Sequence, residues 1–157
     1  MTNPLSTPAA SNVGLLLARV ALGAYLALIG FENVTRGVSA FAASHKRAMS
    51  EWINPSYAEV FLTMYPVVHV AAGTMLVLGV LTRVSAFLLS ATLLVFMVCV
   101  QGLSRGGPGP FDPNWIFLAV GVALLTNGGG QFTLPALLGK KPAPPPAAKA
   151  PAPAPAK

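Results

Sequence analysis

Four apolar segments constrain this chain more than any other feature of its sequence. They carry one charged residue between them, Arg19, and the first three hold 19 to 22 residues each. At 1.5 Å per residue, a helix of that length covers about 28 Å or more, which is enough to cross the hydrocarbon core of a bilayer. The segments are residues 13–31, 60–81, 84–103 and 113–127.

The composition is that of a membrane protein. Only 9% of the 157 residues are charged and 54% are hydrophobic, whereas a soluble domain carries about 25% charged residues. We therefore predict an all-α membrane protein, a four-transmembrane-helix bundle whose fourth helix is short at about 21 Å. The bundle occupies residues 13–138, between an N-terminal segment (1–12) and a Pro/Ala/Lys-rich C-terminal tail (139–157). The lipid bilayer is the first partner that this composition implies.

Helix-start signals precede the second and fourth segments. Asn54 and Asp112 are each followed by proline, the order expected for an N-cap and a first helical residue. Between the first two segments, apolar side chains recur at helical spacing from Val38 to Trp52. This spacing predicts an amphipathic helix at the membrane interface between helices 1 and 2. A soluble loop is the alternative for that stretch.

Charged residues divide unequally between the two sides of such a bundle. With four spans both termini share one side, which takes six basic and no acidic residues, while the other side takes four of each. Basic residues favour the cytoplasmic side, so we predict cytoplasmic termini in the inner membrane of a bacterium or archaeon. The net charge of +6 then reflects topology, and no folded polar surface remains to bind nucleic acid.

The tail is dominated by proline and alanine. Residues 140–157 hold seven of the 15 prolines, so we expect an extended, semi-rigid polyproline II segment without a core of its own. A disordered spacer is the alternative.

Two ionisable residues fall inside the apolar segments, Arg19 and His69, and such residues are costly in a membrane. Gly23, Ala27 and Gly30 share the helical face of Arg19. Small residues let a neighbouring helix approach closely, so Arg19 is expected to point into the bundle. A side chain that reaches back to the cytoplasmic headgroups is the alternative.

His69 lies near the middle of its segment, on a stripe that includes Tyr65. Pro66 removes one helical hydrogen bond and frees the Leu62 carbonyl, which could accept from the histidine. A ligand or proton site and an axial metal ligand are the other interpretations. In upright helices Arg19 and His69 would differ in depth by about 9 Å, so one bound headgroup could contact both. The candidate ligand contacts are therefore Arg19, His69 and Tyr65.

The sequence offers no independent catalytic motif and names no catalytic residue. Cys99 is the only cysteine, which excludes a disulfide, a CxxC pair and a cysteine-based zinc or iron–sulfur site. His45 falls in the connecting segment, so neither a bis-histidine haem nor another metal is expected within this chain. No P-loop, GxGxxG or GxSxG sequence is present.

Three motifs occur in the order of one known family. Leu17–Gly23 contains an arginine followed four residues later by glycine, and Gly30 comes near the end of the same helix. Gly73–Arg83 reads as glycine, an aliphatic run, glycine and a Leu-Thr-Arg entry to the next helix. Gly128–Leu134 is a glycine-rich, aromatic ending. With these motifs the chain resembles the DoxX-like family of four-helix membrane proteins over roughly residues 15–138. It departs from the pattern at His69 and Pro135, where the family usually has glutamate and aspartate.

The resemblance implies a redox setting. The family includes the small membrane subunit of thiosulfate:quinone oxidoreductase, so the resemblance implies an accessory subunit of a membrane redox complex. Arg19, His69 and Tyr65 would then be contacts for a quinone, and other subunits of the complex would be partners. The alternative is a non-catalytic structural or docking subunit of a larger membrane assembly, without a redox role of its own.

Overall fold

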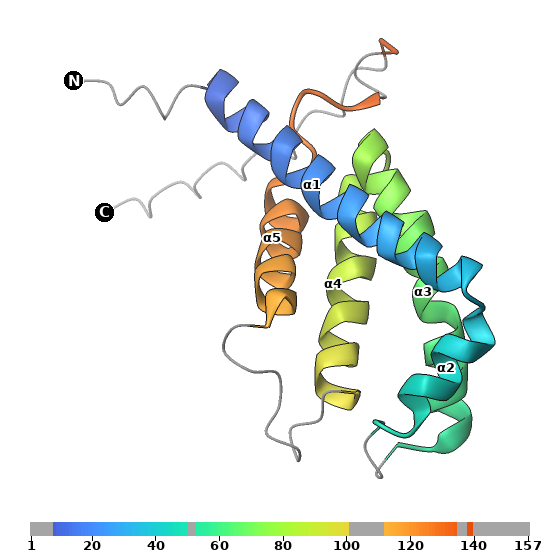
Figure 1. Ribbon diagram of the computed structural model, residues 1–157. Coiled ribbons are helices and arrows are strands. Elements are labelled where there is room, and N and C mark those ends of the chain that lie inside the picture. Colours follow the sequence, from blue (N-terminus) through green and yellow to red (C-terminus); the bar gives the residue numbers. More distant parts are fainter. Residues whose placement is uncertain (1–7, 50–52, 101–111, 135–137, 140–157) are drawn as a thin grey trace, which may run out of the picture.

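The computed structural model describes residues 8–49, 53–100, 112–134 and 138–139, and Figure 1 shows how they are arranged. This described part is all-helical and has no strand, as predicted. Its elements are α1 (Pro8–Thr35), α2 (Val38–Lys46), α3 (Pro55–Leu78), α4 (Thr82–Cys99) and α5 (Pro113–Asn127). The predicted Pro/Ala/Lys-rich tail lies outside the described residues, except for Gly139.

Both predicted helix starts are confirmed. The Asn54 side chain caps α3 by accepting a hydrogen bond from the Ser56 backbone N–H at 2.9 Å. Asp112 caps α5 by accepting from the Asn114 N–H at 2.8 Å. In each case proline follows the cap, where the missing N–H costs no helical hydrogen bond. At the other end of α3, Gly79 adopts the left-handed conformation (φ 70°) that closes a helix.

Within the described residues, three helices are long and apolar enough to cross a membrane: Ser11–Thr35 within α1, Pro55–Leu78 and Thr82–Cys99. The apolar α5 is shorter, at 15 residues. Large apolar side chains point outward along these helices, with Leu28 68% exposed and Ile116 66% exposed. Such exposed apolar faces suggest a lipid bilayer as the surroundings, and with it a multi-pass membrane protein.

The long helices differ in how closely they approach one another. α1 runs obliquely to α3, α4 and α5 and approaches α3 so closely that a Cβ atom on Gly23 would lie 2.7 Å from the Gly73 carbonyl oxygen. The glycine face predicted to admit a neighbouring helix therefore meets α3. A core of buried apolar side chains fills the space between the helices. Its members are Leu22, Leu26, Ala72, Leu76, Ala86, Leu89, Leu93 and Leu124.

α2 confirms that a helix lies between the first two segments, but it ends at Lys46 and does not continue to Trp52 as the spacing predicted. It follows a break at Gly37, whose φ of 103° suits only glycine. It buries Ala42 against α3 in a second apolar cluster that also contains Leu62 and Val100. The position of α2 at a membrane surface stays a prediction.

Candidate functional site

Arg19 points into the protein, as expected, and its partners are backbone carbonyls. The side chain is 2% exposed. Its Nη1 donates to the Gly129 carbonyl at 2.9 Å and its Nη2 donates to the Phe132 carbonyl. A Cβ atom on Gly79 would lie 2.6 Å from Nη1. Arg19 thus joins α1 to the end of α3 and to the glycine-rich segment after α5.

Arg19 and His69 lie at different levels along α3, so a headgroup that contacts both would have to span more than the depth difference expected for upright helices. Arg19 is level with Gly79, whereas a Cβ atom on Gly30 would meet the His69 Cβ at 2.9 Å. Ten residues of α3 separate His69 from Gly79, or about 15 Å of helix rather than 9 Å. The glycine contacts between α1 and α3 set this register. Sequence patterns indicate where each helix ends, but they do not show which turns of two helices meet.

His69 is buried without a normal hydrogen bond. It is 1% exposed, and among the described residues neither Nδ1 nor Nε2 has a hydrogen-bond partner of normal geometry. The Tyr65 backbone lies near the ring without completing a hydrogen bond of normal geometry. The interpretation in which the Leu62 carbonyl satisfies His69 is therefore wrong. Leu62 lies seven residues earlier, about 10 Å along the helix, beyond the reach of the imidazole.

An aromatic cluster surrounds Tyr65, one turn from His69. The Tyr65 ring meets the His69 ring edge-on, with centroids 4.0 Å apart. It also lies between Phe96 of α4 at 4.7 Å and Phe41 of α2 at 5.8 Å, nearly parallel to the latter. The rings therefore bring α2, α3 and α4 together. The members of this aromatic cluster are Phe41, His45, Phe61, Tyr65, His69 and Phe96.

His45 belongs to the same cluster, which the sequence analysis missed. Its ring lies 4.2 Å from Phe41 and 5.6 Å from Phe96, between centroids. The four-residue spacing of Phe41 and His45, matched by that of Phe61, Tyr65 and His69, could have indicated two facing aromatic stripes. Helical spacing alone does not show which stripes meet.

Hollows flank α2 on two sides. One of about 290 Å³ lies between the end of α1 and α2 and includes Asn33, Phe41 and His45 in its lining. Another of about 430 Å³ lies between α2 and α3, where Lys46 donates to Glu59 at 2.8 Å. Both lie near the aromatic cluster, and the first is lined by two of its rings.

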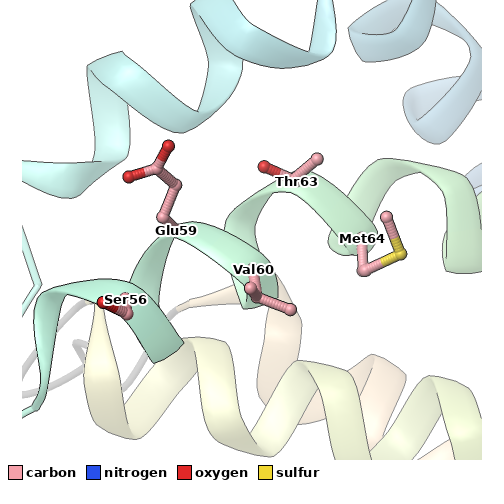
Figure 2. Close-up of a pocket in the computed structure, with 5 residues that line it drawn as sticks. All are labelled: Ser56, Glu59, Val60, Thr63 and Met64. Atoms are coloured by element: carbon pink, nitrogen blue, oxygen red, sulfur yellow. The ribbon is translucent and has the colours of Figure 1, made fainter.

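A third hollow, of about 460 Å³, lies along the first half of α3 (Figure 2). Glu59 and Thr63 project from its rim toward α2, while Val60 and Met64 are 62% and 49% exposed. Because Glu59 is already paired with Lys46, this hollow offers a ligand few unpaired polar groups. Among the residues that the structure describes, no three His, Cys, Asp or Glu side chains gather as a metal site would require.

The family comparison covers two of the three sequence motifs, Leu17–Gly23 and Gly73–Arg83. The DoxX family model matches residues 14–102, more than half of the chain, from the first turns of α1 to just beyond the end of α4. No curated protein and no solved structure matches the chain. The matched region contains Arg19, Tyr65 and His69. The chain is a member of the DoxX family.

Proposed function

We propose that the protein is an integral membrane accessory subunit of a quinone-linked redox complex. Its family and its apolar helices suggest a membrane-associated, redox-related role. The finer proposal is that His69 and Tyr65 form the contact with the quinone. It also includes four spans, with α5 as the short fourth helix.

His69 is the observation that carries this proposal. A buried imidazole with both nitrogens unpartnered is destabilising by roughly 1–3 kcal/mol when nothing binds it. Such groups are rare in folded proteins and mark functional sites inside membranes. A quinone oxygen can accept from one imidazole nitrogen, and the neighbouring Tyr65 ring supplies an aromatic surface.

The proposal gives Arg19 a different role from the one expected. Its guanidinium already donates to two carbonyls and is 2% exposed. Those contacts favour Arg19 as the residue that holds α1 against the rest of the bundle. Of the three candidate contacts, Tyr65 and His69 remain for the ligand.

The test is isolation of the native complex with its bound quinone, from cells carrying His69→Leu and from cells carrying the matched control Val67→Leu. Val67 lies on the same helix but is 44% exposed. We expect the histidine variant to insert and assemble while losing quinone, and the control to retain it. Equal quinone in both preparations would contradict the site.

Topology is a separate part of the proposal. Four spans would place both termini on the same side of the membrane, and the excess of basic residues on that side favours the cytoplasm of a bacterial or archaeal cell. A periplasm-dependent reporter fused after Lys141 should then be inactive, and a cytoplasm-dependent reporter at the same position should be active. The reverse pattern would contradict the cytoplasmic position of the C-terminus.

A structural or docking subunit is the second candidate function. The observation in its favour is the burial of Tyr65 and His69, which are 8% and 1% exposed. At that burial, none of the three hollows described above gives a ligand direct access to the imidazole. Recovery of an intact complex with unchanged quinone-linked activity from the His69→Leu strain would support this candidate.

A further inference from the structure

The hollow between α1 and α2 combines an aromatic wall with unused hydrogen-bonding groups. We call it the α1–α2 hollow. Its volume of about 290 Å³ is near the lower end of the usual range for ligand sites, about 300–1,000 Å³. A single substituted ring suits this volume, and a nucleotide does not. The lining residues are Asn33, Arg36, Gly37, Ala40, Phe41, Ser44 and His45.

The hydrogen bonds of His45 determine what it can offer a ligand. Nδ1 lies 2.9 Å from the Phe41 carbonyl oxygen and 3.0 Å from the Ser44 hydroxyl oxygen. We infer the tautomer with the proton on Nδ1, because the carbonyl can only accept and the Ser44 hydroxyl can accept from Nδ1 while it donates to that carbonyl. In the neutral ring Nε2 then has a free lone pair. Ser44 is already engaged, since its hydroxyl donates to the same carbonyl at 2.8 Å. His45 therefore offers the hollow a hydrogen-bond acceptor.

The other lining groups supply a flat wall and donors. Phe41 presents an aromatic ring that lies 4.2 Å from His45 and 5.8 Å from Tyr65. The Asn33 amide and the Arg36 guanidinium are donors, although Arg36 also pairs with Glu32 at 2.6 Å. Acceptor, aromatic wall and donor together match a planar ring with a hydroxyl group on one edge and an oxygen on the opposite edge.

We propose that the α1–α2 hollow binds the ring of a quinol, whose hydroxyl donates to Nε2 of His45 while an oxygen on the opposite edge accepts from Asn33. The choice of a quinol rests on the proposed function, whereas the position rests on the hollow and its lining. Through Phe41 and Tyr65 the hollow connects to the unpartnered His69. His45 is thus a second ligand-contacting histidine, linked to His69 by packed aromatic rings and not by an open passage.

The test measures equilibrium binding of a ubiquinol analogue with one prenyl unit to the full-length protein in detergent, without oxygen. The key variant is His45→Phe, which keeps a ring beside Phe41 and Phe96 but removes the acceptor. The control is Ser39→Ala, on the side of α2 that lines the hollow with α3. We expect about a tenfold weaker affinity for His45→Phe, the loss of one hydrogen bond, and no change for the control.

A photoreactive analogue of the same quinol locates the ring independently of any variant. Adducts within residues 33–45 support the proposal. Adducts confined to α3 near His69, with unchanged binding by His45→Phe, overturn the α1–α2 hollow while leaving the proposed function intact. Absence of saturable binding by the wild-type protein overturns both.

Discussion

Two buried polar side chains, Arg19 and His69, differ in how far their hydrogen-bonding groups find partners inside the apolar bundle. Both are 2% exposed or less and both lie at the contact between α1 and α3. Arg19 donates to two carbonyls, while the His69 imidazole has no partner. Equal burial therefore does not mean an equal role. Arg19, whose two Nη atoms are hydrogen-bonded although its Nε has no partner among the described residues, holds the fold together. His69, with neither ring nitrogen bonded, is the candidate for ligand binding.

Arg19→Met gives the largest expected effect, because it removes two hydrogen bonds that link α1 to the segment after α5. The Gly129 and Phe132 carbonyls would lose their donors, and α1 would lose its link to the segment after α5. We expect destabilisation by about 3 kcal/mol or more, seen as earlier thermal unfolding and aggregation in detergent.

Arg83→Met is the matched control for this change. Arg83 is exposed, and its hydrogen bond to the Thr126 carbonyl is long, at 3.4 Å. The control should unfold at nearly the wild-type temperature. Similar losses in the two variants would show that Arg19 does not hold the bundle together.

Gly30→Ala should rank second, because it disturbs the close contact beside His69. The new Cβ would lie 2.7 Å from the Pro66 carbonyl oxygen and 2.9 Å from the His69 Cβ, so α1 and α3 must move apart. We expect a loss of about 2 kcal/mol, measured by thermal unfolding. Gly14→Ala is the control, since nothing lies within 4 Å of that position, and it should be neutral or stabilising.

His69→Leu should change stability far less than Arg19→Met. The variant exchanges an unpartnered imidazole for an apolar side chain of similar size, so stability should stay within about 1 kcal/mol of wild type or rise. The measurement is the same unfolding experiment, on protein freed of quinone. A loss as large as that for Arg19→Met would show that the imidazole has a structural partner.

Lys46→Met should have the smallest effect. The ion pair with Glu59 is exposed on both sides (47% and 63%), and such pairs contribute little. We expect an unfolding temperature indistinguishable from wild type at moderate salt. A clear decrease would mean that this pair, rather than the apolar contact at Ala42, holds α2 on α3.

Much of the fold could be predicted from the sequence because helices in lipid leave strong local signals. Apolar runs and the caps at Asn54 and Asp112 indicated the helices, and the spacing from Val38 onward indicated α2. The small-residue face of α1 also correctly predicted a close helix contact. These features depend on nearby residues, so a single sequence contains them.

The candidate site was harder to predict because it depends on helix register. The levels of Arg19 and His69 follow from which glycine of α1 meets which turn of α3, and the carbonyl partners of Arg19 lie 110 and 113 residues away. For the same reason His45 was assigned to a connecting segment, although its ring shares a cluster with Tyr65. Composition and periodicity do not specify such long-range contacts.

The distance in sequence between Arg19 and its carbonyl partners has a consequence for synthesis of the chain. At about 5–20 residues per second, the 110 residues between Arg19 and Gly129 take about 6–20 s to emerge. During that interval α1 can already lie in the membrane, while its arginine still lacks both acceptors. We expect Arg19 to reach toward the headgroups at this stage and to turn inward once residues 129–132 arrive. In the last step of assembly, the Arg19 guanidinium would then leave its contacts with lipid headgroups and water and donate to the two carbonyls instead.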